Sequence, residues 1–486
     1  MNFQIIKRTL GWIMLFEALF FLVPTITAIV YGESEIVAFL ISMAICVAIG
    51  ILCLLGKPKS EYIYAKEGFV ITALSWIVIS IFGALPFVFS GVIPSFVDAL
   101  FETVSGFTTT GATIFATGEA IDALPKSIII WRSFTHWIGG MGVLVFIMAF
   151  LPLSGARNMH IMRAESPGPT VDKLVPKVKT TAAVLYSIYI AMTLAQFILL
   201  LCGGMSAFEA INCAVSTAGT GGFSWNSKGL GGYSSYVQIV TTVFMILFSI
   251  NFNSYYLIIR GKLKDAFNTE VRVFLIIVLV AIGVITANVL LTPSESYDYS
   301  VGEAIKHSAF SVGAVISTTG FSTENFDLWP ALSKTILVIL MFVGACAGST
   351  GGGMKVSRWM ILFKGMRHEL KMMLHPRQVK KITIDKRPVE NETVRTVTFY
   401  LIAYRMVFIS SLLIVSIDYP DLLTNFTAVT ATINNIGPGL GAVGPIGNFA
   451  FYSDVSKIVF IFDMLAGRLE IFPILLLLTP ATWKKQ

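Results

Sequence analysis

Charged side chains are scarce in this chain. Only 13% of its 486 residues are Asp, Glu, Lys or Arg, whereas 55% are hydrophobic. Soluble globular domains carry about 25% charged residues, so the composition excludes an ordinary soluble domain. It predicts a protein with many membrane-spanning segments.

Cysteine and histidine are also scarce, at five residues each. The cysteines lie in or beside apolar stretches at spacings that fit no metal site, so we interpret them as small buried hydrophobic residues. The histidines are scattered, and the sequence offers no convincing nucleophile–base pair. These absences argue against a metal centre and a membrane-embedded enzyme, and we expect no enzymatic activity.

Apolar runs long enough to cross a bilayer, which takes about 20 residues, occur ten times. The first follows Lys7 and Arg8 and is longer than the apolar core of a signal peptide, so we interpret it as a signal anchor. Glycines cut short the run at 334–348. The runs lie at 9–31, 36–56, 68–90, 128–152, 180–203, 236–259, 271–292, 334–348, 396–417 and 455–480.

The formal net charge of +7 is unevenly distributed. Basic residues gather in alternate loops, above all between Lys355 and Arg395, whereas the other loops are acidic, for example at Glu33, Asp122 and Asp327. Basic loops favour the cytoplasmic side of a membrane. The pattern predicts a multi-pass protein with both termini in the cytoplasm, and the basic excess indicates topology, with no nucleic-acid partner.

Four polar segments between apolar runs centre on a glycine. They are Phe107–Gly111, Gly219–Phe223, Ser317–Phe321 and Asn434–Pro438. Counting back from the glycine aligns them: the residues thirteen before it are Asp98, Glu209, His307 and Thr424, and those six before it are Ser105, Ser216, Ala314 and Ala431. The partial match in register indicates one unit repeated four times.

A short stretch precedes each glycine, at 96–108, 206–218, 303–317 and 421–433. As helices, these stretches reach only some 20 Å at about 1.5 Å per residue, too short to span a bilayer. We expect re-entrant helices that enter from outside and stop midway, with the negative end of each dipole facing a cation. Irregular backbone at that depth must be buried or line a watery path. The alternative is surface helices followed by ordinary turns.

The predicted fold is an all-α membrane protein with two N-terminal helices and four pseudo-symmetric helix–pore-loop–helix repeats around one central pore. Residues 1–60 form the N-terminal extension. The repeats are predicted at 61–155, 156–262, 263–375 and 376–486. Their pore loops are predicted at 96–113, 206–224, 303–322 and 421–440, with an intramembrane loop at 344–353 in the third repeat.

A ring of backbone carbonyls can replace the water around a dehydrated monovalent cation. Carbonyls turn inward where a residue takes positive φ, which glycine allows without steric cost. Threonine hydroxyls can add oxygens or brace the backbone. The predicted ion-binding residues are Thr109, Thr110, Gly111, Thr220, Gly221, Gly222, Thr318, Thr319, Gly320, Asn435, Ile436 and Gly437.

Glycine interrupts the run at 334–348, where it makes up five of the ten residues 344–353. Each glycine costs a helix about 1 kcal/mol relative to alanine, so we expect a flexible loop below the filter. Close packing of glycine between helices is the alternative. A phosphate-binding loop is excluded because G-K-[ST] is missing.

Arg468 lies near the middle of the last apolar run. A charge at that depth costs roughly 2.5–3.5 kcal/mol and usually faces a cavity or a partner. Asp463 and Glu470 are candidate structural partners, and the other interpretation places Arg468 in the pore. Lys355 and Arg358 lie nearer the cytoplasmic end and are expected at the interface or near a regulatory partner.

Several separated motifs resemble the Trk/Ktr/HKT potassium transporter superfamily. The extra N-terminal helices make the chain most similar to the TrkH/TrkG type of membrane subunit, and the resemblance covers essentially the whole chain. It rests on the four T-x-G-like loops and on the segments His136–Gly142, Gly348–Lys355 and Gly467–Pro473.

The resemblance implies a homodimeric potassium-uptake subunit of the cell (inner) membrane, with one pore per protomer and a cytosolic, nucleotide-binding TrkA-type partner. One glycine per repeat shapes the filter, and since all four are glycine here, K⁺ is favoured over Na⁺ as the permeant ion. The fourth loop departs from T-x-G, which puts strict fourfold selectivity in doubt. The implied gate comprises Gly344, Gly348, Ser349, Thr350, Gly351, Gly352, Gly353 and the pore-facing Arg468.

K⁺ is thus the only bound species expected on this chain, with no organic cofactor. Few ligating residues per repeat predict modest selectivity for K⁺ over Na⁺. The basic segment from Lys364 to Arg395, which contains Pro376 and Pro388, is a candidate docking surface for the partner. A proton- or sodium-coupled symporter with alternating access remains the alternative function.

Overall fold

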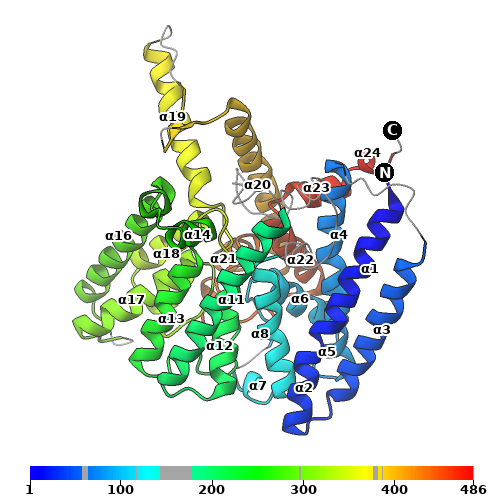
Figure 1. Cartoon of the computed structure of the whole chain (residues 1–486). Helices are drawn as coiled ribbons and strands as arrows, with labels where there is room; N and C mark the ends of the chain where they lie inside the picture. Colours follow the sequence, from blue (N-terminus) through cyan, green and yellow to red (C-terminus); the bar gives the residue numbers. More distant parts are fainter. Residues whose placement is uncertain are drawn as a thin grey trace.

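The computed structural model describes residues 1–56, 64–115, 118–142, 178–294, 297–375, 381–385 and 387–484. In these residues the chain is almost wholly helical (Figure 1). The one small sheet there pairs β1 (Thr383–Ile384) antiparallel with β2 (Arg387–Pro388). The boundary predicted between residues 155 and 156 and the end of the run at 128–152 lie outside the described residues.

The N-terminal extension packs as a close helix pair. Helix α1 (Phe3–Phe20) continues into α2 (Leu22–Tyr31), and α3 (Ile36–Leu54) returns beside α1. Gly11 and Gly50 face each other: a Cβ on Gly11 would lie 2.9 Å from the Gly50 carbonyl oxygen. Small residues let membrane helices approach this closely. The pair then packs against α4 (Ala65–Gly83).

Long apolar helices are fewer than the ten predicted runs. In the described part of the chain, six are long and apolar enough to cross a membrane, and a seventh exists if a bent pair counts as one span. The six spans are Phe3–Tyr31, Ile36–Leu54, Lys66–Phe89, Thr181–Cys202, Thr269–Leu291 and Asn391–Asp418. They include α5 (Leu85–Phe89), α11 (Val178–Cys202), α16 (Thr269–Leu291) and α20 (Asn391–Asp418).

The remaining runs form shorter helices that stop early. These are α8 (Lys126–Gly140), α13 (Ser235–Phe248), α18 (Ala331–Val343) and α22 (Asp454–Arg468). The break predicted after α18 is confirmed, because residues 344–355 separate it from α19 (Val356–Leu374). The runs at 236–259 and 455–480 are each divided into two helices, and the first pair still counts as one span if a bent pair is allowed.

Each of these two runs contains a break between its helices. Helix α13 meets α14 (Phe252–Ile259) at 93°. Helix α22 is separated from α23 (Phe472–Leu478) by Leu469, Glu470 and Ile471, and the last two take positive φ. Pro473 lacks the N–H that would continue the helix. No glycine cluster marks either break, so the apolar pattern alone runs through them.

Four short helices lie where the sequence predicts re-entrant segments. They are α6 (Phe96–Phe107), α12 (Ala207–Gly219), α17 (Val301–Ile316) and α21 (Leu422–Ile433). Ser95, Ser206, Ser300 and Asp421 cap their N-termini by accepting backbone N–H groups. Helix α17 begins earlier than predicted, so Glu303 completes its capping box, and His307 lies within the helix.

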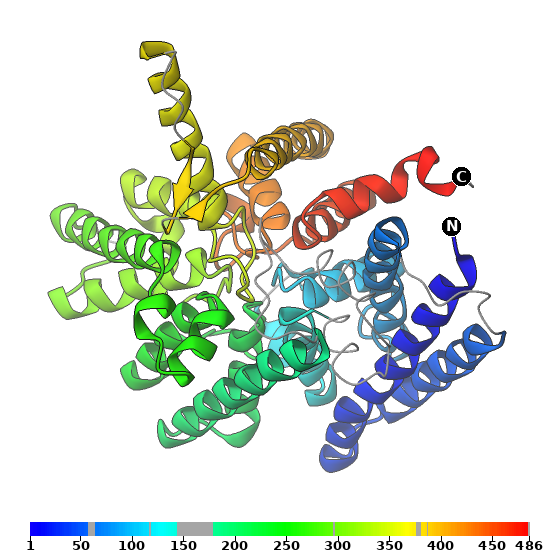
Figure 2. The same cartoon turned by 45° about the horizontal axis from the view of Figure 1, so that its top comes forward.

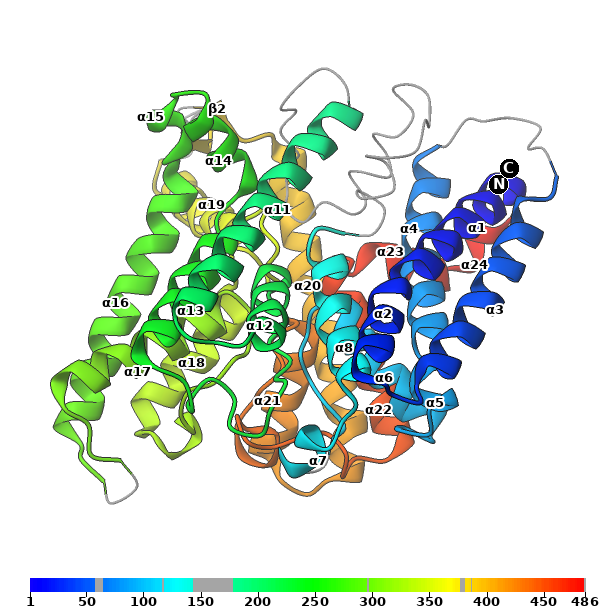
Figure 3. The same cartoon turned by 60° about the horizontal axis from the view of Figure 1, so that its bottom comes forward.

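Helices from all parts of the chain are arranged around the centre of the molecule (Figure 2). Among the short helices, α12 lies beside α8 and α17 beside α16 (Figure 3). Helix α19 projects away from the body (Figures 1 and 2). The two ends of the chain are neighbours, since the ring of Phe3 stacks on Trp483 at 6.5 Å between ring centroids. The remaining short helices are α7 (Gly118–Asp122), α15 (Leu263–Ala266), α24 (Pro480–Trp483), η2 (Phe326–Leu328) and η3 (Gly441–Val443).

Candidate ion-binding site

The loops after the four short helices touch one another in a closed cycle. We call residues 109–111, 220–222, 318–320 and 435–437 the glycine loops. In each, the final glycine lies against a carbonyl of the next loop, and the fourth returns to the first. A Cβ on Gly111 would lie 1.9 Å from the oxygen of Gly221, on Gly222 1.8 Å from Thr319, on Gly320 2.0 Å from Ile436 and on Gly437 2.8 Å from Thr110. The glycine loops therefore enclose a common axis.

Each glycine loop contains two residues with positive φ. The glycines take φ of 79°, 73°, 76° and 91° at Gly111, Gly222, Gly320 and Gly437, as the sequence predicts. The second residue was missed: two positions earlier, φ is 58°, 57°, 61° and 55° at Thr109, Thr220, Thr318 and Asn435. A left-handed conformation costs a residue with a side chain roughly 1–2 kcal/mol. This strain, present in every loop, marks the site as one where backbone direction matters.

A repeated hydrogen-bond pattern explains these left-handed residues. The N–H of Thr109 donates to the Gly106 carbonyl at 3.0 Å, and the N–H of Thr110 donates to the Ser105 carbonyl at 2.8 Å. This is the Schellman motif, which ends a helix at a left-handed residue. The other three loops repeat the second bond from Gly221 to Ser216, Thr319 to Ala314 and Ile436 to Ala431. The acceptors are the residues aligned by sequence, and only their carbonyls take part, so serine and alanine serve equally.

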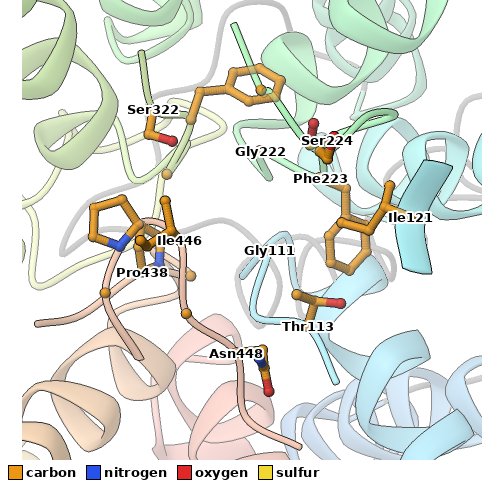
Figure 4. A pocket seen from close by; sticks show the side chains of 18 of the residues that line it. Gly111, Thr113, Ile121, Gly222, Phe223, Ser224, Ser322, Pro438, Ile446 and Asn448 are labelled. Carbon is orange, nitrogen blue, oxygen red and sulfur yellow. The ribbon is translucent and has the colours of Figure 1, made fainter. Parts of the chain in front are cut away.

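A cavity of about 650 Å³ opens on one side of the glycine loops. All four loop glycines line it, together with Arg132, Phe223 and other residues that follow the loops. Figure 4 shows Gly111, Gly222, Ser322 and Pro438 approaching the opening from separate segments of the chain. The cavity thus borders all four glycine loops.

A buried ion pair braces the first two loops from behind. Arg132 Nε donates to Glu102 Oε1 at 2.7 Å, and both side chains are almost fully buried. Glu102 also accepts bonds from the Thr113 hydroxyl and the Ile114 N–H, each at 3.1 Å. Arg132 reaches the Ser224 carbonyl at 3.2 Å. Sequence reasoning missed this pair, although an arginine inside an apolar run is the signal that identified Arg468.

The 344–353 loop lies directly against two glycine loops. The N–H of Gly352 donates to the Thr318 hydroxyl at 2.6 Å, and the N–H of Gly353 donates to the Asn434 carbonyl at 3.1 Å. Gly344, Gly348 and Gly353 take φ of 69°, 69° and 76°, so these glycines are needed for the path of the chain. The loop and the glycine loops therefore form one connected structure.

The opposite edge of this loop fills the break between α13 and α14. Backbone groups that the broken helix leaves open are satisfied there. Cys346 N–H donates to the Ser249 carbonyl, and Phe252 N–H donates to the Gly348 carbonyl, both at 3.0 Å. The Thr350 hydroxyl donates to the Phe248 carbonyl at 3.1 Å. The predicted 344–353 loop thus packs into the break between α13 and α14, which sequence reasoning missed.

Arg468 joins the 344–353 loop to the end of α8. Its guanidinium donates to the carbonyls of Thr350 at 2.9 Å, Gly139 at 2.5 Å and Gly140 at 2.7 Å. Of the two acidic partners considered from sequence, Asp463 accepts a bond from the Ser411 hydroxyl at 2.7 Å, and Glu470 forms an ion pair with Arg358. The arginine is held by three backbone oxygens, which come from the 344–353 loop and from the end of α8.

Lys355 and Arg358 are not at an exposed surface, contrary to the expectation that they mark the interface. Lys355 is buried, and its ammonium donates to the Gly351 carbonyl. The Arg358 guanidinium is buried as well, pairs with Glu470 and lies 4.1 Å from the centroid of the Tyr400 ring. Tertiary packing brings both cations against the loop and its surroundings.

Long apolar helices, broken helices and a ring of carbonyls below an open cavity define a polytopic membrane protein of the ion-transporting class. The TrkH family model, described as a cation transport protein, matches residues 35–485. The chain belongs to this family, and the resemblance stated from its motifs is confirmed.

Relatives and a solved structure extend the match over the whole chain. The chain is 35% identical to the Trk system potassium uptake protein TrkH of Salmonella typhimurium, covering 100% of both. It is 32% identical to TrkG of Escherichia coli K12 over 99% of each chain. The crystal structure of the potassium transporter TrkH from Vibrio parahaemolyticus matches with a TM-score of 0.88 and 33% identity, covering 100% of both chains.

Proposed function

We propose that this protein takes up K⁺ across the cell membrane through the passage enclosed by its glycine loops. The carrying observation is the closed cycle in which each loop glycine abuts a carbonyl of the next loop, at the floor of a cavity of about 650 Å³. Carbonyl rings of this kind replace the hydration shell of K⁺. Relatives that are named potassium uptake proteins support the same ion.

The selectivity filter consists of the twelve residues of the glycine loops. Each of the four predicted repeats contributes one loop, and the repeats surround a single pore. The C-terminal ends of α6, α12, α17 and α21 all lead into these loops, so their partial negative charges add to the attraction for a cation. Small ligand sets per repeat make the filter favour K⁺ over Na⁺ modestly.

The 344–353 loop acts as the gate below the filter, and Arg468 is its electrostatic barrier. Two contacts support this role. The loop bonds directly to Thr318 and Asn434, and the Arg468 guanidinium bonds to the Thr350 carbonyl of the loop. A cation held at that place repels K⁺, so opening requires the loop and Arg468 to move aside.

The protein works as a homodimer in the inner membrane, with both termini in the cytoplasm and a cytosolic nucleotide-binding partner of TrkA type. The projecting helix α19 supports an assembly, because its exposed residues include Phe363, Met373 and Leu374. Apolar side chains exposed on a projecting helix favour contact with another surface. The basic segment from Lys364 to Arg395 is the docking region for the partner.

Ion-coupled symport with alternating access is the second candidate function. It requires an ionisable group that changes state at the ion site. The twelve filter residues contain no acidic or basic side chain, so direct conduction is the better-supported mechanism.

Flux from purified protein in lipid vesicles tests the proposal. We expect uptake of K⁺ and Rb⁺ faster than Na⁺, driven by voltage alone, and faster K⁺ flux when residues 344–353 are deleted. K⁺ flux that follows a proton gradient at fixed voltage would indicate symport. Equal rates for K⁺ and Na⁺ would contradict the assigned filter, and regulated flux after the deletion would place the gate elsewhere.

A further inference from the structure

Glu270, in the first turn of α16, binds both the 344–353 loop and the start of α19. Its Oε1 accepts the N–H of Ala347 at 2.7 Å and the N–H of Ser357 at 3.2 Å. Beside this point, the N–H of Val356 donates to the Ala345 carbonyl at 3.1 Å. One carboxylate oxygen therefore ties the beginning of the loop to the start of α19. Hydrogen bonds to a carboxylate are stronger than those between neutral groups.

The residue before Glu270 is attached to the small hairpin of β1 and β2. Asp385, in the turn of this hairpin, accepts bonds from the N–H and the hydroxyl of Thr269, the former at 3.0 Å. Lys364 of α19 anchors the other side, since its ammonium donates to the Thr383 carbonyl at 2.7 Å. Asp385 is exposed, so the hairpin turn is accessible from outside the protein.

The contacts of the hairpin and those of the 344–353 loop involve adjacent residues, Thr269 and Glu270, in the first turn of α16. A displacement of the hairpin acts through Asp385 on Thr269 and therefore on Glu270, the next residue. The far side of the loop is bonded to Thr318 in the glycine loops. Hydrogen bonds and the short covalent stretches between them thus connect the exposed hairpin with the candidate filter. Packed and hydrogen-bonded networks of this kind can carry coupling between two distant sites.

We propose that Glu270 is a positioning residue that holds the 344–353 loop closed, and that Asp385 couples the exposed hairpin to it. The proposal rests on the proposed function, because it presupposes that this loop is the gate. Releasing the carboxylate frees Ala347 and Ser357 together, which lets the loop swing away from the filter. A cytosolic protein that binds and displaces the hairpin therefore opens the pore.

Rb⁺ uptake into vesicles that contain this chain alone tests the role of Glu270. We expect Glu270→Ala to raise the uptake rate by about tenfold, the effect of weakening the closed state by about 1.4 kcal/mol. Glu270→Gln, which keeps a neutral acceptor, should fall between Glu270→Ala and wild type. Asp265→Ala is the matched control: it removes an exposed acid of α15, five residues before Glu270, and should leave uptake unchanged.

A variant on the donor side covers the case in which Glu270→Ala does not fold. Ser357→Pro removes the N–H that Glu270 binds, at the second residue of α19. Proline is tolerated in the first turn of a helix, and α23 already carries Pro473 at its second residue. We expect a gain of uptake here too, with the K⁺-to-Na⁺ preference retained. Wild-type rates in folded Glu270→Ala and Ser357→Pro would overturn the positioning role, because general loss of structure lowers uptake.

A double-mutant cycle tests the coupling to the hairpin. Asp385→Ala should raise uptake by about threefold, as expected for an exposed charged contact. In the Glu270→Ala background it should add nothing, because the contact it acts through is already lost. Independent, multiplicative effects would overturn the coupling. The outcomes stay separable from the proposed function. If the chain conducts, and conducts faster without residues 344–353, but its uptake is unchanged by Glu270→Ala, only this inference is refuted.

Discussion

Replacing Gly111 by serine places a Cβ 1.9 Å from the carbonyl oxygen of Gly221, at a φ of 79°. Backbone oxygen cannot retreat as a flexible side chain would, so the neighbouring loop must move by more than 1 Å to reach ordinary contact, about 3.4 Å or more. The left-handed conformation adds roughly 1–2 kcal/mol of strain. We expect the oxygen ring to open at this point and Na⁺ entry to rise relative to K⁺.

The size of the effect should depend on how close a Cβ at each glycine would come to the neighbouring carbonyl oxygen. A Cβ on Gly437 would lie 2.8 Å from the Thr110 oxygen, a milder approach than the 1.9 Å at Gly111. Gly111→Ser should therefore reduce the K⁺-to-Na⁺ flux ratio by about tenfold, equal to 1.4 kcal/mol, and Gly437→Ser by less. Gly302→Ser is the matched control, because nothing lies within 4 Å of its Cβ position.

Competitive flux of K⁺, Rb⁺ and Na⁺ into vesicles measures these ratios. Thermal unfolding of each variant in detergent separates selectivity from loss of fold. An unchanged ratio in folded Gly111→Ser, or a larger change in Gly437→Ser than in Gly111→Ser, would refute the assignment of these carbonyls to ion binding.

Three further changes test the surroundings of the glycine loops. Arg468→Gln removes the cationic barrier and should raise flux in the absence of any partner by about tenfold, whereas an unaltered rate would exclude a gating role. Breaking the buried pair by Arg132→Met should destabilise the fold by about 3–5 kcal/mol, and adding Glu102→Gln should restore part of it, as thermal unfolding can measure. Thr318→Val leaves the Gly352 N–H without its acceptor at a cost of about 1–3 kcal/mol. We expect faster flux, because this bond holds the 344–353 loop against the filter. Slower flux would contradict that role of the bond.

The local features of the candidate site were predictable from sequence. Residues 96–108 and 421–433 are predicted as short helices, and the structure has α6 at Phe96–Phe107 and α21 at Leu422–Ile433. Positive φ at Gly111 and the helix break at 344–353 also follow the prediction. Helix length and glycine conformation depend on neighbouring residues, which a sequence displays directly.

Contacts between distant residues were beyond sequence reasoning. Arg132 and Glu102 are 30 residues apart, and Glu270 binds Ala347, which is 77 residues away. The break between α13 and α14 was missed because the apolar run continues on both sides of it, although Asn251 caps α14 there. Its backbone groups are satisfied by the distant 344–353 loop. Lys355 was expected nearer the cytoplasmic end, at the interface or near a regulatory partner. It is buried instead, because the folded chain places it against the Gly351 carbonyl of the 344–353 loop.

By itself, the sequence determined that this is a membrane protein with four glycine-centred loops after short helices, because hydropathy, helix length and backbone freedom are local properties. Only the tertiary structure decided that Thr109, Thr220, Thr318 and Asn435 adopt a left-handed conformation and that each loop glycine abuts the carbonyl of the next loop. A left-handed threonine is unfavourable alone and persists where surrounding contacts enforce it. Those contacts come from segments that meet only in the folded chain.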